Sequence, residues 1–427
     1  MITAILNARI LDPASNTDAE GGLIIEDGKV AAWGTGVQAA PSGADDVIDA
    51  VGLCLAPGLI DLRVKTGEPG EEHRETLATA SRAALSGGVT QFVVMPDTRP
   101  VIDDVALVQF IARKGAEAGG AHIHAAGALT VGLGGTAMAE IGLMKEAGAV
   151  VFTNGDVPVA DPSIMKRALA YAGSRGAIVA SRPDTPALTG NAVMAASSYA
   201  ARLGLKGMPV ESEWIATARD LTLAETTDVQ LIVDGVSTAR TLELITEAKA
   251  RGATVGCTAN AYSLFFNDLD VGDYLTYCKV NPPFRVEPDR QALITALAAG
   301  DIEAIVSGHD PQPPESKRLP FGEASFGAAG LETTLSAVLS LVHDGPLDLV
   351  SALRPLTCGP ADLLGLQGGR IANGAPADLI LFDPDRPWKC EREDLISRST
   401  NSPFDGRLLQ GQVLRTIVGG ATLFQRD

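Results

Sequence analysis

Short apolar runs alternate with alanine-rich stretches of helical periodicity through the middle of the chain. Each run is bounded by Gly, Pro or polar residues, and the helical stretches between them are about 10–15 residues long. Predicted strands are 59–64, 91–95, 122–126, 149–152, 177–180, 229–233, 253–256 and 302–306. Predicted helices include 76–85, 105–118, 163–172, 211–226, 239–251 and 290–298. Eight strands separated by helices predict an α/β fold of the (β/α)8 type.

Both ends of the chain have a different pattern. The segment GLIIEDGKVAAWG near the start and GAPADLILFDPD and QVLRTIVGG near the end are short β-branched runs separated by Gly turns. Such runs predict antiparallel strands. The pattern therefore indicates β structure, then α/β, then β again.

Composition and charge narrow the class of protein. The 427 residues are 46% hydrophobic, which is sufficient for a large core, and the net charge is −18. A strongly acidic chain without clustered Lys and Arg does not favour nucleic acid or anionic membranes as partners. The start of the chain lacks a basic flank before an apolar core, and no run of about 18 apolar residues occurs. We therefore expect a cytoplasmic protein that neither crosses nor binds a membrane.

Several segments are specific enough to indicate a family. They are PGLIDLRV, EPGEEHRET, MPDT, GALT, GVSTART, KVNPPFR, SGHDP, GLET and GAPADLILFD. Together they resemble the dihydroorotases of the cyclic amidohydrolase superfamily along nearly the whole chain. The resemblance implies an amidohydrolase-type (β/α)8 TIM-like barrel over residues 53–369. It also implies a small β-sandwich domain built from both termini, residues 1–52 and 370–427.

The metal-ligand positions of that family carry unsuitable residues here. The resemblance implies one or two divalent metals at the barrel mouth, held by imidazole and carboxylate groups. The positions of those ligands fall on Arg63, Lys65, Asn154, Ser181 and Gly235. A protonated guanidinium has no lone pair to donate, and an ammonium has none until it loses a proton. We therefore expect no metal cofactor.

The catalytic and substrate-binding positions are altered as well. The family's catalytic aspartate falls on Gly308, and a substrate-contacting arginine falls on Gly67. The asparagine of its Met-Pro-Asn-Thr motif falls on Asp97, and its last eighth-strand histidine falls on Gln312. Only Asn281 persists among the substrate contacts.

Histidines are too few to rebuild the site. There are five, and only His309 follows a predicted barrel strand, which makes His309 and the adjacent Asp310 candidate remnants of a catalytic group. His122 and His124 lie inside the third predicted strand, away from its carboxyl end, so we expect packing or hydrogen bonding instead of metal binding.

These substitutions lead to a functional hypothesis. We expect a dihydroorotase homologue that is a non-catalytic structural or regulatory partner of aspartate carbamoyltransferase in pyrimidine biosynthesis. The partner, and assembly into a homo- or hetero-oligomer, are implied by the resemblance to inactive homologues of this kind.

Two alternatives remain open. One is an active, metal-dependent cyclic amidohydrolase of dihydroorotase, hydantoinase or allantoinase type, with zinc and a rearranged site around His309, Asp310, Asp97 and Asp156. The other is a binding module in which vestigial site residues, with Arg63 and Lys65, hold a small carboxylate. Because buried charges must be paired, we favour internal ion pairs of Arg63 and Lys65 with Asp97 or Asp156 over ligand binding.

Overall fold

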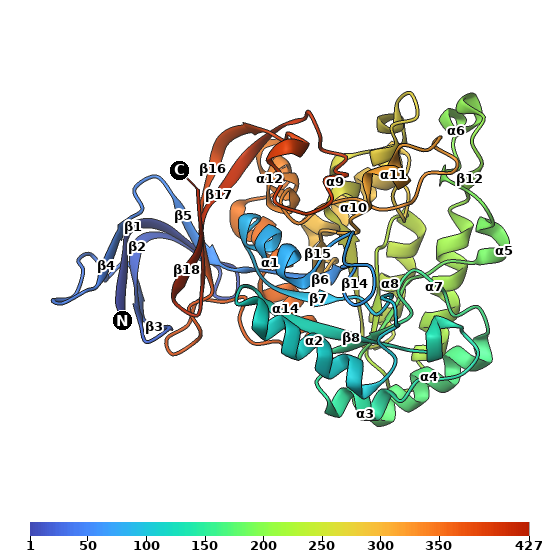
Figure 1. Cartoon of the computed structure of the whole chain (residues 1–427), viewed down its shortest axis with the longest axis horizontal. Helices are drawn as coiled ribbons and strands as arrows, with labels where there is room; N and C mark the ends of the chain where they lie inside the picture. The colour runs from blue at the N-terminus through green and yellow to red at the C-terminus, as the bar shows by residue number, and fades with distance from the viewer. Residues whose placement is uncertain (427) are drawn as a thin grey trace.

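The computed structural model describes residues 1–426 and contains a nearly closed barrel of parallel strands (Figure 1). The barrel strands are β6 (Leu59–Val64), β7 (Val89–Val94), β8 (His122–Ala128), β9 (Val151–Thr153), β10 (Val179–Ser181), β13 (Leu231–Val233), β14 (Val255–Asn260) and β15 (Ala304–Val306). A parallel bridge between Val64 and His309 joins the first strand to the segment after the last one. All eight predicted strands are present, in the predicted order.

Helices cover the outside of the barrel. The crossover helices include α1 (Leu77–Ser86), α2 (Val105–Ala118), α3 (Ile141–Glu146), α4 (Pro162–Ser174), α7 (Glu211–Ala224), α8 (Ala239–Ala250) and α10 (Glu287–Ala299). Further helices are α5 (Pro186–Thr189), α6 (Ser198–Leu203), α9 (Ala261–Phe265), α11 (Pro314–Lys317), α12 (Thr334–His343), α13 (Leu349–Leu353) and α14 (Cys358–Leu364). Local signals set some ends: Asp104 accepts from Leu107 N at the start of α2, and Gly119, at φ +64°, ends it.

Alternate apolar side chains of the barrel strands point inward and fill the inside of the barrel. Ile60, Leu62, Val93, Ile232 and Val306 belong to one buried cluster. Residues of α14 join the same cluster. The interior is therefore a packed core, and the polar chemistry is confined to the rim where the strands end.

Strands from both termini pair into one mixed sheet, shown at the left of Figure 1. Its members are β1 (Ile2–Asp12), β2 (Thr17–Glu26), β3 (Lys29–Gly34), β4 (Asp46–Asp49), β5 (Cys54–Pro57), β16 (Leu379–Lys389), β17 (Leu408–Val418) and β18 (Ala421–Gln425). Strand β5 pairs with β1 and with β16, and so connects the two ends of the chain. A separate cluster that includes Ile10, Leu23 and Leu381 forms the core here.

Two short strands, β11 (Met194–Ala195) and β12 (Gly207–Met208), form a small separate pair between α5 and α7. Across residues 1–426, no helix combines the length and the apolar character needed to cross a membrane. The predicted division at residues 52 and 370 stays a prediction, although β5 lies just inside the predicted barrel range and pairs with the terminal sheet.

Candidate functional site at the barrel mouth

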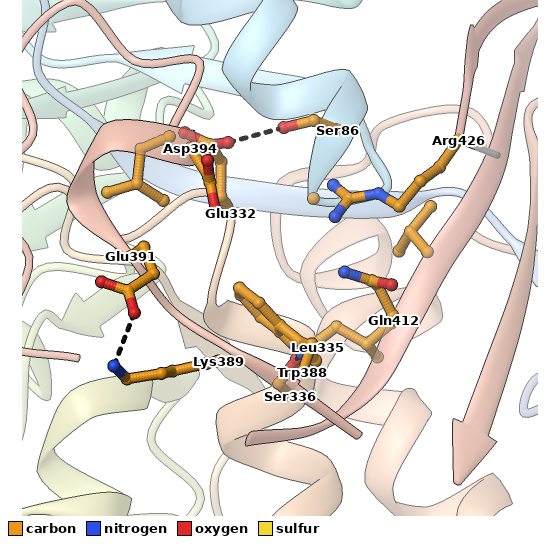
Figure 2. Close-up of a pocket in the computed structure, with 13 residues that line it drawn as sticks. Ser86, Glu332, Leu335, Ser336, Trp388, Lys389, Glu391, Asp394, Gln412 and Arg426 are labelled. Atoms are coloured by element: carbon orange, nitrogen blue, oxygen red, sulfur yellow. Dashed lines mark hydrogen bonds and ion pairs between the residues drawn. The ribbon is translucent and has the colours of Figure 1, made fainter. Parts of the chain in front are cut away.

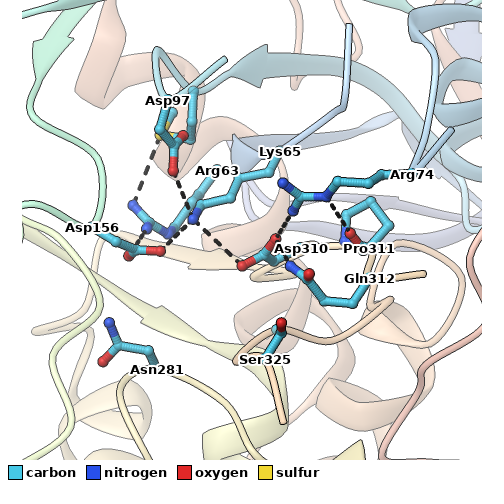
Figure 3. Close-up of polar contacts among 12 residues, drawn as sticks. Arg63, Lys65, Arg74, Asp97, Asp156, Asn281, Asp310, Pro311, Gln312 and Ser325 are labelled. Atoms are coloured by element: carbon cyan, nitrogen blue, oxygen red, sulfur yellow. Dashed lines mark hydrogen bonds and ion pairs between the residues drawn. The ribbon is translucent and has the colours of Figure 1, made fainter. Parts of the chain in front are cut away.

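Eight charged side chains meet where the barrel strands end. We call them the mouth cluster: Arg63, Lys65, Arg74, Arg182, Asp97, Asp156, Asp234 and Asp310. Four are cations and four are carboxylates, and Figure 3 shows Arg63, Lys65, Arg74, Asp97, Asp156 and Asp310 pointing toward one another. Charges can be buried at this density because each has a partner of opposite sign.

Arg63 lies at the end of β6 and is almost fully buried, with 5% of its side chain exposed. One guanidinium nitrogen is 2.6 Å from Asp156 Oδ1, and another contacts Asp234 Oδ2. Burial alone would lower the pKa of Arg63, but Asp234 and Asp156 outweigh it and raise the pKa above its usual value. Arg63 therefore stays protonated and has no lone pair for a metal.

Lys65 contacts three carboxylates. Its Nζ is 2.7 Å from Asp97 Oδ2, 3.4 Å from Asp310 Oδ2 and in contact with Asp156 Oδ2. Burial would lower the pKa of Lys65, but Asp156, Asp310 and Asp97 together raise it. These contacts confirm the prediction that Arg63 and Lys65 pair internally with Asp97 and Asp156.

Asp156 is the shared partner of three cations. Besides Arg63 and Lys65, the Nε of Arg182 lies 2.7 Å from Asp156 Oδ1. Burial tends to raise the pKa of Asp156, but Lys65, Arg182 and Arg63 lower it far below the usual range. Its side chain is nevertheless 27% exposed, more than any of these three cations.

The contribution of Asp156 to stability should depend on pH in a defined way. Because its folded-state pKa lies below the unfolded value of about 3.8, the contribution is complete above that value and is lost as the pH falls towards the folded-state pKa. We expect the difference in unfolding free energy between wild type and Asp156→Asn, measured with urea, to be constant from about pH 5 to 8 and to narrow below about pH 4. A difference that changes between pH 5 and 8 would contradict the assignment.

Arg182 and Asp234 were missed from the sequence. Arg182 directly follows β10, and Asp234 directly follows β13. A charged residue immediately after a predicted barrel strand is a signal that could have found both. The Arg182 side chain has room at the mouth because residue 235 is glycine. A Cβ at Gly235 would lie 2.5 Å from Arg182 Nη1.

Gly308 has no room for the family's catalytic carboxylate. Its φ is +60°, and an added Cβ would lie 2.7 Å from both Tyr262 Cε1 and Asn260 Oδ1. Tyr262, from α9, is buried and was not singled out from the sequence. The space next to the eighth strand is therefore filled by a side chain of a different element.

Asn154 and Ser181, which fall on metal-ligand positions of the family, make hydrogen bonds to neighbouring segments. Asn154 accepts hydrogen bonds from Thr130 N and Oγ1, at 3.1 and 2.7 Å, and donates to the carbonyls of Leu133 and Val157. Ser181 donates to Asp220 Oδ2 at 2.5 Å. Both therefore hold neighbouring segments of the chain in place.

The candidate remnants after β15 separate into two environments. Asp310 belongs to the mouth cluster: its Oδ1 accepts from Arg74 and from Gln312 Nε2, both at 2.7 Å. His309 is fully buried elsewhere, with Nε2 3.7 Å from Glu75 and Nδ1 accepting from Gly330 N at 3.3 Å. Of the rearranged site predicted as an alternative, Asp97, Asp156 and Asp310 come together and His309 does not.

Asn281 borders the site through its backbone. Its carbonyl accepts from Arg182 and, at 3.5 Å, from the Tyr262 hydroxyl. The histidines of the third strand lie outside the mouth: His122 contacts Asp378 at 3.2 Å, and His124 bonds to Gln91 at 3.3 Å. The prediction that they are hydrogen-bonded is confirmed.

The donor groups at the mouth do not fit a divalent metal. Three cations occupy the region where the family places its ligands, and the nearby carboxylates are already paired with them. Within residues 1–426, His, Cys, Asp and Glu side chains form no group of three or more suited to a metal. Zinc, implied by the family resemblance, is therefore not matched by this set of residues.

A cavity of about 210 Å³ lies away from the mouth, between the barrel and the terminal sheet (Figure 2). Its wall includes Ser86, Glu332, Trp388 and Arg426. Ser86 donates to Glu332 at 3.1 Å, and Trp388 Nε1 donates to Gly411 O at 3.0 Å. Its wall comes from helix ends and sheet strands, whereas catalysis in barrels of this type takes place at the carboxyl ends of the barrel strands.

Two family descriptions match the chain. Residues 52–264 match "Dihydro-orotase-like", and residues 213–423 match "Amidohydrolase family". Among curated relatives, a protein named dihydroorotase from Pelobacter propionicus is 39% identical over 422 residues, 99% of each chain. Another named dihydroorotase, from Syntrophotalea carbinolica, is 40% identical and covers 99% of this chain and 98% of its own.

Solved structures show the same architecture. L-hydantoinase (dihydropyrimidinase) from Arthrobacter aurescens aligns with a TM-score of 0.89 and 25% identity, over 100% of this chain and 96% of its own. A dihydropyrimidinase from Brevibacillus agri aligns with a TM-score of 0.83 at 24% identity, which supports the fold alone.

These similarities correct one sequence-based hypothesis. The prediction of a non-catalytic structural or regulatory role is wrong, because relatives that match over the whole length are named dihydroorotase and the structural neighbours are hydantoinases. They support the enzymatic alternative, a cyclic amidohydrolase. An association with aspartate carbamoyltransferase is not tested by them and stays a prediction. With matches along its full length, this chain belongs to the dihydroorotase-like branch of the amidohydrolase family.

Proposed function

We propose that this protein is a cyclic amide hydrolase of the dihydroorotase type, acting at the barrel mouth. The observation that carries the proposal is the 39–40% identity to proteins named dihydroorotase over essentially the whole chain. The mouth cluster lies where barrels of this type place their chemistry and is rich in groups that can stabilise charge or carry a proton.

Hydrolysis of a ring amide sets clear requirements. The oxygen of water bonds to the carbonyl carbon, the C–N bond breaks, the nitrogen takes a proton, and a carboxylate is formed. A base must accept a proton from the water, and positive groups must stabilise the negative charge that develops on the carbonyl oxygen. The mouth cluster contains candidates for both roles.

Asp310 is the candidate base. Its Oδ1 is bound by Arg74 and Gln312, and its Oδ2 faces Lys65 at 3.4 Å. Oδ2 is the oxygen that would accept the proton from water and return it to the leaving nitrogen. Lys65, with its raised pKa, would supply the positive charge near the carbonyl oxygen.

The amidohydrolase family implies zinc, which polarises the carbonyl and activates water when it is bound. The side chains at this mouth do not supply its ligands, so no step is assigned to a metal. We therefore expect turnover that does not depend on added zinc.

The test is an assay of the full-length protein with dihydroorotate and with a hydantoin, after treatment with chelator and again with added zinc. We expect ring opening at the same rate in both samples. Asp310→Asn should lower kcat by about 10²- to 10⁴-fold. Asp18→Asn, at the surface pair with Arg9, should leave it unchanged. Absence of ring opening for both substrates in both samples would overturn the proposal, provided that circular dichroism shows a folded protein.

A further inference from the structure

We infer that Arg63, Lys65 and Arg182 form a site for one ligand carboxylate, which Asp156 fills until the ligand displaces it. The class of ligand rests on the proposed function, since opening of a ring amide always produces a carboxylate. The existence of the anion site rests on the geometry alone.

Three cations converge on the carboxylate of Asp156. Asp156 Oδ1 accepts from Arg63 at 2.6 Å and from Arg182 Nε at 2.7 Å, and Oδ2 contacts Lys65. Guanidinium groups present several donors in a planar array that matches a carboxylate, and an ammonium adds a point charge. A carboxylate from a bound molecule would find the same donors.

Asp156 leaves one hydrogen-bond donor of Arg182 unused. Arg182 Nη1 is buried and has no hydrogen-bond partner, although the Arg182 side chain is only 6% exposed. It lies beside Gly235, in the wall of a cavity of about 30 Å³ that Asp156 and Asn281 also line. Buried donors are rarely left unsatisfied, so this nitrogen marks a place where an acceptor is expected.

The cavity is too small for a ring-sized ligand while Asp156 is in place. A volume of this size corresponds to about one or two water molecules. Asp156 is the most exposed carboxylate of the mouth cluster, with 27% of its side chain accessible, against 19% for Asp97, 14% for Asp310 and 7% for Asp234. It follows β9 in a turn where Gly155 has φ +59°. Movement of this one turn would release the donors and enlarge the site.

The net charge of the mouth cluster without Asp156 indicates how many ligand carboxylates the site binds. Without Asp156, the mouth cluster has four cations, Arg63, Lys65, Arg74 and Arg182, and three carboxylates, Asp97, Asp234 and Asp310. At the rim, Glu71 and Arg99 add one charge of each sign. Four minus three leaves one positive charge, which one carboxylate neutralises.

The experiment is calorimetric titration of the full-length protein with N-carbamoylaspartate and with succinate, and with the uncharged succinamide as the control ligand. Removal of the internal competitor in Asp156→Ala should tighten binding of both carboxylates by about tenfold or more, because the binding-competent state becomes the dominant one. Addition of Arg182→Met to Asp156→Ala should abolish the gain. Succinamide should bind to none of these proteins.

Asp97→Ala is the matched control, since it also removes a carboxylate from Lys65 but leaves Asp156 in place. We expect no comparable tightening in this variant. If Asp156→Ala does not fold, Asp156→Asn and the rise in melting temperature of wild type with succinate serve instead. Equal tightening in Asp97→Ala, or no tightening in either Asp156 variant together with no stabilisation of wild type, would overturn the inference.

The two proposals can fail separately. Carboxylate binding that follows Asp156 and Arg182, without ring opening of any substrate, would support the anion site and reject the hydrolase. Ring opening without an effect of Asp156 substitution on carboxylate affinity would support the hydrolase and reject the anion site.

Discussion

Replacement of Arg63 by methionine is expected to lower the free energy of unfolding by about 3–5 kcal/mol. The substitution retains most of the apolar volume but removes the charge that pairs with Asp234 and Asp156. Asp234, with 7% of its side chain exposed, would then be left with Arg182 at 3.9 Å as its nearest cation. Urea unfolding followed by circular dichroism measures the loss.

Arg9→Met is the control for this prediction. Arg9 makes two hydrogen bonds of 2.7 Å to Asp18, but both side chains are about 40% exposed. Water screens such a pair, so we expect a loss of at most about 1 kcal/mol. Similar losses in the two variants would show that the ion pairs at the mouth are not energetically distinct from those at the surface.

Substitution of Gly308 by aspartate, which restores the residue type of the family's catalytic position, is expected to destabilise the protein by roughly 2–4 kcal/mol without raising activity. The positive φ contributes part of the cost, and the new Cβ, 2.7 Å from Tyr262, contributes the rest. The carboxylate cannot take its family position because Tyr262 and Asn260 fill the space. Urea unfolding and the dihydroorotate assay together test both parts.

Gly365→Asp is the control that separates the cost of the positive φ from the cost of steric overlap at the new Cβ. Gly365 ends α14 with φ +66°, close to the +60° of Gly308, and an added Cβ there meets no atom within 4 Å. Its cost should therefore be that of the backbone conformation alone, about 1 kcal/mol. An equal cost at both positions, or a gain of turnover in Gly308→Asp, would show that the space beside Tyr262 can accept a side chain.

Much of the fold could be predicted from the local pattern of hydrophobic and polar residues. The strand at Leu59–Val64 was predicted with its observed bounds, and so was the helix at Val105–Ala118. Both have strong local signals: an apolar run after Pro57-Gly58 in one case, and a helical period between Asp104 and Gly119 in the other. Such signals act within a few residues and do not need the rest of the molecule.

The site was accessible only in part. The cations at Arg63 and Lys65, and the carboxylates Asp97 and Asp156 as their partners, followed from the substitutions in recognisable motifs. The prediction of a non-catalytic role is wrong. Unusual residues at a site show that the site has changed, but they do not show what it now does.

The sequence by itself determined the order of the strands, the identity of the residues at their ends and the presence of several charged residues at the mouth. Tertiary structure alone decided the other ion pairs of the mouth cluster. Asp234 and Arg63 are separated by 171 residues and meet through barrel closure, and His309 turns to Glu75 although its neighbour Asp310 joins the mouth cluster. The reason is physical: hydrophobic periodicity acts locally, whereas the partner of a buried charge depends on where separate strands end in space.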